Sequence, residues 1–143
     1  MATGEVTGTD FSTLTYDNPT GLAYDRQRYI LYVLVEGALI AYHEASTAPA
    51  GTEPARVITG PSIAALFTAD GRLALDAESD RIFFSETDSL TVGTYDDASL
   101  LVGEIAPDRT IALDAPASFF WGLDYDASRD ELYVGDQKPG TGV

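Results

Sequence analysis

The 143-residue chain contains no cysteine, one lysine, one histidine and no long apolar run. Without cysteine the fold has neither disulfides nor thiolate metal ligands, so its stability must come from packing. A single histidine, His43, excludes a zinc site built from several histidines of one chain. No apolar run reaches the roughly 20 residues that span a bilayer, and residues 1–5 lack the basic and apolar parts of a signal peptide. As written, the sequence predicts a cytoplasmic protein, an expectation that would lapse for a piece of a longer exported protein.

Basic residues are also scarce, because 8 lysines and arginines oppose 23 aspartates and glutamates to give a net charge of -15. Nucleic acids and anionic lipids attract basic surfaces, so neither a nucleic acid nor a membrane is an expected partner. Acidic surfaces with almost no lysine resemble those of proteins from high-salt cytoplasm, where screening suppresses self-repulsion. A halophilic source and an acidic protein from a GC-rich genome both fit this composition.

What the chain does contain is a segment that recurs at a period of about fifty residues. Each copy ends in an aspartate, and an apolar triplet follows six residues after it. The copies are Leu22–Asp25 with Leu31–Val33, Leu73–Asp76 with Ile82–Phe84, and Leu123–Asp126 with Leu132–Val134. Short β-type runs at this period are typical of propeller blades, which are four-stranded sheets that bury their faces against neighbouring blades.

Two further strands are expected in each complete repeat. The third strands are predicted at 38–42 and 89–93, and the fourth strands at 54–58 and 107–111. Each fourth strand begins with a proline, whose missing N–H does no damage at a strand entry. The small, polar segment 44–53 predicts a surface loop. Helical periodicity is absent over any useful length, and 62–67 is long enough for one turn at most.

The repeat predicts one half-propeller over residues 1–143. Its parts are the fourth strand of a shared blade and a loop (1–20), a blade (21–60), a second blade (61–113) and an incomplete blade that lacks its last strand (114–143). Val6–Gly8 matches Ile58–Gly60 at a spacing of 52 and would supply the shared fourth strand. Closed propellers have about four blades or more, so the chain is too short to close alone. We therefore expect an all-β homodimer in which terminal strand exchange forms a six-bladed ring without exposed edges.

The blade pattern Gly-Leu-x-x-Asp, Leu-Tyr-Val and Pro-x-Arg-x-Ile resembles six-bladed propellers of the NHL, YWTD and SMP-30/gluconolactonase-like group. The resemblance covers nearly the whole chain and is carried by Gly21–Asp25, Leu31–Val33, Ser46–Thr47, Pro54–Ile58, Gly122–Asp126 and Leu132–Val134. These motifs build blades and specify no activity, because the group includes protein-binding modules, carbohydrate binders and metal-dependent hydrolases. Members of the group usually carry all blades on one chain, so the short length departs from the family.

Three aspartates at equal repeat positions, Asp25, Asp76 and Asp126, are candidates for a cation site on a ring axis. Their recurrence in every blade instead favours an architectural role, in which each carboxylate accepts hydrogen bonds from turn N–H groups. Calcium needs about six to eight oxygens at one point, which the spacing does not show. His43 ends an expected third strand and is interpreted as a surface residue.

The predicted ligand-binding region is the set of loops that lead from a fourth strand into the next first strand, because in the resembled group these loops surround one mouth of the channel. Aromatic rings beside carboxylate and amide groups suit sugars and small organic ligands. The predicted ligand-binding residues are Tyr16, Asp17, Asn18, Asp70 and Trp121. Asn18 and Asp70 are the first choices if a metal is present, whereas Phe119 and Phe120 are assigned to packing between blades.

The sequence predicts a non-catalytic propeller that serves as a binding or interaction scaffold, because blade motifs are strong and catalytic motifs are absent. No catalytic residue, metal site or cofactor is predicted, and the ligand is left open between a small molecule, a sugar and a protein. Two alternatives remain. One is a lactonase-like hydrolase in which calcium polarises a carbonyl, which the resemblance alone supports. The other is a designed or excised propeller fragment without selected activity.

Overall fold

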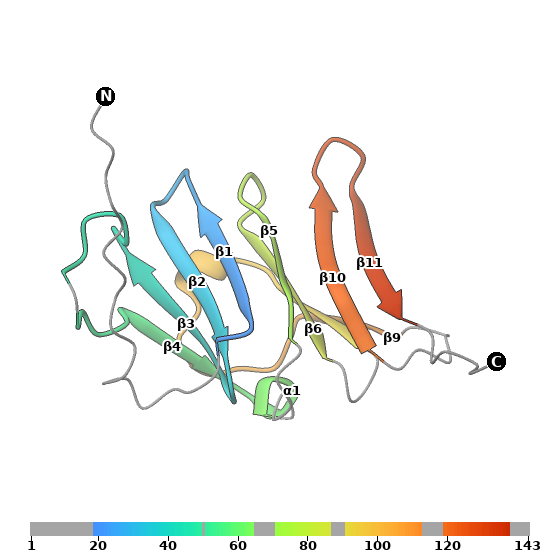
Figure 1. Ribbon diagram of the computed structural model, residues 1–143, viewed down its shortest axis with the longest axis horizontal. Coiled ribbons are helices and arrows are strands. Elements are labelled where there is room, and N and C mark those ends of the chain that lie inside the picture. Colours follow the sequence, from blue (N-terminus) through green and yellow to red (C-terminus); the bar gives the residue numbers. More distant parts are fainter. Residues whose placement is uncertain (1–18, 50, 65–70, 87–90, 113–118, 138–143) are drawn as a thin grey trace.

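The computed structural model describes residues 19–49, 51–64, 71–86, 91–112 and 119–137, and every structural statement below refers to these residues. They form strands joined by turns and by longer connections (Figure 1). In chain order the elements are β1 (Gly21–Asp25), β2 (Ile30–Val35), β3 (Ala38–His43), β4 (Arg56–Thr59), α1 (Pro61–Ala64), β5 (Leu73–Asp76), β6 (Arg81–Glu86), β7 (Thr91–Tyr95), η2 (Ala98–Leu100), β8 (Gly103–Glu104), β9 (Arg109–Ala112), β10 (Phe119–Asp126) and β11 (Glu131–Gln137). The all-β fold class is confirmed.

The strands form three blades that stand side by side (Figure 1). Blade 1 is the antiparallel sheet β1-β2-β3-β4, blade 2 is β5-β6-β7-β9, and blade 3 is described as the hairpin β10-β11. The first strands β1, β5 and β10 are neighbours in space. The strand order therefore follows the prediction, although β4, β9 and the described part of the third strand β7 each begin two residues after the predicted start.

The second strand of blade 1, β2, is apolar on both faces. Ile30, Tyr32 and Leu34 pack in the core between blades 1 and 2, whereas Val33 and Val35 belong to a second cluster on the opposite face of blade 1. A strand that is buried on both faces loses the polar alternation of a surface strand and becomes a continuous apolar run. Side chains of β2 are consequently almost fully buried.

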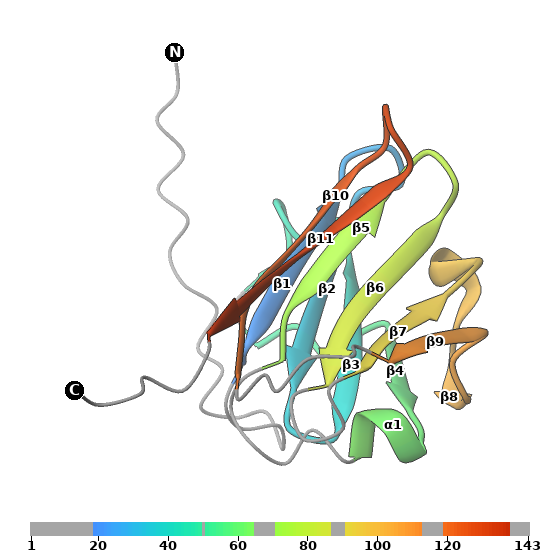
Figure 2. The same ribbon diagram turned by 90° about the vertical axis from the view of Figure 1, so that its right-hand side faces the viewer.

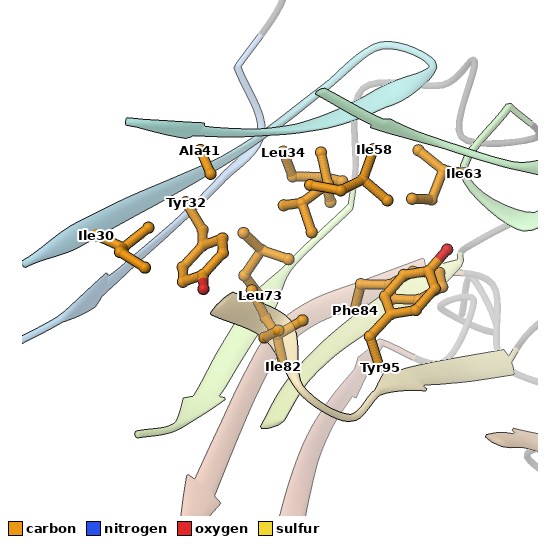
Figure 3. Packing of buried hydrophobic residues seen from close by; sticks show 12 residues of the cluster. Ile30, Tyr32, Leu34, Ala41, Ile58, Ile63, Leu73, Ile82, Phe84 and Tyr95 are labelled. Atoms are coloured by element: carbon orange, nitrogen blue, oxygen red, sulfur yellow. The ribbon is translucent and has the colours of Figure 1, made fainter. Parts of the chain in front are cut away.

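The largest core fills the space between blades 1 and 2 (Figure 3). The cluster comprises Ile30, Tyr32, Leu34, Leu39, Ala41, Ile58, Ile63, Leu73, Ile82, Phe84, Tyr95 and Ala98. The rings of Phe84 and Tyr95 stack with centroids 5.3 Å apart. Ile63 reaches this core from the single turn of α1, which agrees with the expectation of one turn at most in this part of the chain.

A segment of blade 2 crosses to the outer edge of blade 1, and we call this segment, residues 96–108, the strap (Figure 2). Its strand β8 pairs parallel with β4, and Ile105 N–H donates to the Thr59 carbonyl at 2.8 Å. Tyr95 Oη donates to the Ile105 carbonyl at 3.1 Å. Gly60 is required here because a Cβ at this position would collide with the Ile105 carbonyl oxygen. The sequence did not predict the strap or its η2 turn.

Blade 3 packs on blade 2 through a smaller cluster. Ala74, Phe83 and Val92 of blade 2 meet side chains of β10 and β11, and the Phe83 and Tyr125 rings lie 4.8 Å apart. The outer part of the blade 2 face that meets blade 3 is open to solvent. Ile111 pairs with Val92 of this face and is 49% exposed. Ile58, the residue at the corresponding position of blade 1, is fully buried against blade 2. Within the described residues β11 is paired on one side only.

Candidate functional site between the first turns

Each blade has a first turn, the loop that joins its first strand to its second, and the three turns lie at one edge of the blades (Figure 1). The aspartate at the end of each first strand accepts hydrogen bonds from turn N–H groups. Asp25 Oδ1 accepts from Gln27 and Arg28 at 2.8 and 3.0 Å. Asp76 Oδ1 accepts from the second and third turn residues at 3.1 and 3.2 Å, and Asp126 Oδ1 from the second at 2.9 Å. The architectural role predicted for these aspartates is confirmed.

The three turns also share one backbone conformation. Each aspartate pairs with the residue five positions later, which opens the second strand. The fourth loop residue has a left-handed φ in every copy, with values of 57° at Tyr29, 54° at Asp80 and 54° at Asp130. Aspartate tolerates this conformation better than most residues, which explains two of the three choices. Residues at equal positions of the turns are therefore structurally equivalent.

Arg28 closes the space between the first turns of blades 1 and 2. Its Nη1 donates to Asp25 Oδ2 at 3.0 Å and to the Ala77 carbonyl of the next turn at 2.7 Å. Its Nε lies 3.7 Å from Asp80 Oδ1. The hydrogen bond to Asp25 is the main cause that raises the pKa of Arg28, so the side chain stays a cation. One guanidinium thus joins two blades through two carboxylates and a carbonyl.

Between the first turns of blades 2 and 3 the equivalent position holds Ser79, which is too short to bridge the turns. A polar cleft of about 320 Å³ lies there, and we call it the rim cleft. Its lining residues are Asp76, Glu78, Ser79, Arg81, Tyr125, Ala127 and Asp130. Burial pushes the pKa of Asp76 up, but hydrogen bonds from the Ser79 hydroxyl and N–H and from the Glu78 N–H, with the charge of Arg81, leave this pKa below its usual range.

The other polar groups of the rim cleft are held by neighbours. Tyr125 Oη donates to Asp130 Oδ1 at 2.6 Å, and this hydrogen bond is the main cause that raises the pKa of Tyr125 to about 12. Arg81 Nε donates to Asp96 Oδ1 at 3.1 Å, whereas Arg81 Nη1 is 3.8 Å from Asp130 Oδ1. The lining therefore carries three carboxylates and one guanidinium that is drawn toward Asp96, an arrangement that favours a cationic ligand.

Most of the predicted ligand-binding residues lie outside the described part of the chain, namely Tyr16, Asp17, Asn18 and Asp70. Trp121 lies in β10, where the pairing with β11 shifts register between Phe120 and Gly122, and this end of β10 is remote from the first turn. The predicted ligand-binding region therefore stays a prediction.

His43 ends β3 and is exposed, as expected of a surface residue. Its Nε2 lies 2.9 Å from Arg56 Nη2, and because a guanidinium only donates, the imidazole accepts there. Residues 44–49 and 51–53 are exposed or half-buried, which agrees with the predicted surface loop. Within the described residues, no group of three or more His, Cys, Asp or Glu side chains is arranged to hold a metal ion, and no helix is long and apolar enough to cross a membrane.

Sequence reasoning missed the rim cleft. The signal was present, because Arg28 and Arg129 occupy the third position of the first and last turns whereas Ser79 occupies it in the middle. The difference predicts a cleft only if the arginine is known to contact the next blade, and this contact is seen in the structure.

No protein-family model matches the sequence, and no curated protein does. Among solved structures the chain is similar to the YWTD β-propeller of nidogen in a nidogen–laminin complex, with a TM-score of 0.54, 18% identity, and coverage of 81% of this chain and 38% of that chain. It is also similar to the β-propeller Hsv2 of Kluyveromyces lactis with loop 6CD replaced by a Gly-Ser linker, with a TM-score of 0.51, 13% identity, and coverage of 84% and 33%. The chain thus spans well under half of the length of either solved chain. These likenesses support a propeller fold and nothing finer.

Proposed function

We propose that the protein is a β-propeller scaffold that binds a partner and performs no catalysis, and that two copies complete one ring. The single observation that supports this assembly is the contrast between Ile58 and Ile111, which occupy the same register position of consecutive blades. Ile58 is fully buried, whereas Ile111 is 49% exposed. Propeller blades bury their faces only against other blades. An exposed apolar residue at this position therefore supports a further strand that packs over this face of blade 2.

A second copy of the chain is the proposed source of that strand. Strand exchange would add a strand of the partner copy to blade 3 as its fourth strand, and blade 3 completed in this way would cover Ile111 of blade 2. An unpaired strand edge is an aggregation hazard, and a closed ring removes it. The bound partner is left open between a small molecule, a sugar and a protein, and the strongly acidic surface disfavours polyanions.

The mass in solution tests the assembly. Light scattering across a salt series is expected to give twice 15.3 kDa, and more readily at high salt, where charge repulsion is screened. Ile111→Asp is expected to give the monomer, because a carboxylate would be buried at the interface. Val102→Asp is the matched control, since Val102 is 63% exposed on the strap, away from the proposed interface. A wild-type monomer, or an Ile111→Asp dimer, would contradict the proposed ring.

Deletion of residues 1–8 addresses strand exchange itself. The proposal expects loss of the dimer or aggregation, because the strand supplied by each copy is removed. A truncated chain that stays a soluble dimer of unchanged stability would contradict strand exchange.

A further inference from the structure

We propose that the rim cleft binds the guanidinium group of an arginine side chain from a partner protein. The proposal names the ligand chemistry of the scaffold and so rests on its proposed binding function, but it does not depend on the closed ring, because every lining residue belongs to one chain.

The junction of blades 1 and 2 contains an equivalent site in which a guanidinium is bound. Between the first turns of blades 1 and 2, the Arg28 guanidinium contacts the Asp25 carboxylate, the Ala77 carbonyl and, at 3.7 Å, the Asp80 carboxylate. This arrangement shows that two consecutive first turns provide a set of acceptors that fits a guanidinium.

The rim cleft repeats the acceptors and lacks the guanidinium. Asp76 lies 51 positions after Asp25, and Ala127 and Asp130 lie 50 positions after Ala77 and Asp80. The hairpin registers and the left-handed φ values agree between these turns, and the first strands of all three blades are neighbours. The bridging donor is absent, because the residue equivalent to Arg28 is Ser79. The lining also contains Arg81 and Tyr125, where the first junction has Ile30 and Leu75.

Arg81 does not occupy the position that the Arg28 guanidinium has in the first junction. Its Nε is engaged by Asp96 at 3.1 Å, its guanidinium carbon lies 5.9 Å from the centroid of the Phe83 ring, and its nearest approach to Asp130 is an ion pair of 3.8 Å. Asp96 also accepts from Arg109 at 2.8 Å, so both arginines are drawn to the outer side of the blade. The carboxylates of Asp76, Glu78 and Asp130 outnumber the one cation in the lining.

The acceptor geometry favours a guanidinium over other cations. A guanidinium presents five N–H donors in a planar fork and can satisfy a carboxylate, a carbonyl and a second carboxylate together, whereas an ammonium is a compact point charge. Asp76 is 4% exposed and stays ionised, so it provides a buried anionic end to the cleft. A volume of about 320 Å³ is at the small end of ligand sites and suits one side-chain head group.

The test is a titration of the full-length protein, labelled with ¹⁵N, with the peptide acetyl-Gly-Arg-Gly-amide. The amide signals of Ser79, Ala127 and Asp130 are expected to shift with a dissociation constant in the millimolar range. The isosteric neutral peptide with citrulline, and the peptide with lysine, are expected to bind about tenfold more weakly, because charge-assisted and bidentate hydrogen bonds are lost. Equal shifts with arginine and lysine peptides would overturn guanidinium recognition in favour of general cation attraction.

Two variants and one control locate the site. Ser79→Arg supplies the guanidinium from the chain itself and is expected to abolish peptide binding while raising the melting temperature. Asp130→Asn is expected to weaken binding about tenfold. Glu36→Gln makes the same charge change at an exposed residue of the turn between β2 and β3 and is expected to leave binding unchanged. Full binding by folded Ser79→Arg and Asp130→Asn would overturn the assignment.

Free L-arginine separates a protein-borne guanidinium from an amino-acid ligand. Its carboxylate would meet Glu78 and Asp130, so weaker binding than that of the peptide is expected. Tighter binding of the free amino acid would contradict a partner protein. Light scattering on the same samples distinguishes failure of one proposal from failure of the other. A dimer that does not bind the peptide would contradict the guanidinium site alone. A monomer that binds the peptide would contradict the closed ring alone.

Discussion

The two junctions between blades share one backbone plan and differ in how they are sealed. Between blades 1 and 2, a twelve-residue core, the strap and Arg28 close the inner, outer and rim parts of the interface. Between blades 2 and 3, a smaller cluster closes the inner part, while Ile111 is half exposed and the rim cleft is open. Repeated sequence therefore specifies how blades stack, and a few non-repeated residues decide whether a junction is closed or left available for binding.

The largest expected difference between the junctions concerns Ile58 and Ile111. Ile58→Ala is expected to lower the free energy of unfolding by about 2–5 kcal/mol, because it leaves a cavity in a closed core. Ile111→Ala is expected to cost below about 1 kcal/mol in the monomer, because water already reaches the side chain. Urea unfolding at several protein concentrations measures both. Equal losses that do not depend on concentration would mean that the second junction is closed within one chain.

Gly60 tests whether the strap contributes to the seal. Gly60→Ala is expected to cost about 1–3 kcal/mol, because the added methyl group must displace the Ile105 backbone carbonyl. The control is Gly122→Ala in the other junction, where a Cβ meets no atom within 4 Å. Thermal unfolding measures the stability, and hydrogen exchange at the Ile105 N–H reports detachment of the strap. Similar costs for both glycines would argue against a close approach at Gly60.

Arg28→Ser converts the rim of the first junction into that of the second. The free energy of unfolding is expected to fall by about 1–3 kcal/mol, because the Asp25 carboxylate and the Ala77 carbonyl lose a charged donor. Arg26→Ser in the same turn is the control, since Arg26 is exposed. Denaturant unfolding compares the two variants. A loss no larger than that of Arg26→Ser would mean that the bridging guanidinium does not stabilise the closed junction.

The smallest expected effect is a pH dependence from Asp76. Its pKa in the folded protein lies below the value of about 3.9 expected in the unfolded chain, so the folded state binds fewer protons there. The stabilisation is present above about pH 4 and is lost as the pH falls through the lower folded pKa. The melting temperature between pH 2 and 6, as an approximate window, should fall less steeply for Asp76→Asn than for the wild type. Identical acid profiles would contradict the lowered pKa.

The sequence predicted the blades because their determinants are local. The aspartate turns, the apolar second strands and the proline entries recur within each repeat, and short-range patterns of this kind specify hairpins directly. The strap escaped prediction because β8 has only two residues and pairs with β4, more than forty positions earlier. Long-range parallel pairing leaves no periodic pattern in the sequence. The need for glycine at position 60 follows only from the close approach of the Ile105 backbone, which the structure shows.

The candidate site was harder to predict than the fold. The repeat made the three aspartates conspicuous, and their turn hydrogen bonds explain that recurrence completely. The chemistry lies instead in an exception, Ser79, whose effect depends on contacts between different blades. Of the residues predicted to bind a ligand, Trp121 is the only one in the described part of the chain, and it lies toward the end of β10 opposite the first turn. Ligand binding by the predicted residues stays a prediction.

The strap also limits how this repeat can be copied or cut. In sequence β8 belongs to blade 2, but in space it is the fifth strand of the sheet of blade 1. Excision of blade 2 alone would remove an edge strand from its neighbour, and a duplicated blade 2 would carry a strap that needs a glycine at the position of Gly60 in the blade before it. The smallest self-contained building block for recombination or protein engineering is therefore the pair of blades 1 and 2, not the single blade that the fifty-residue period defines.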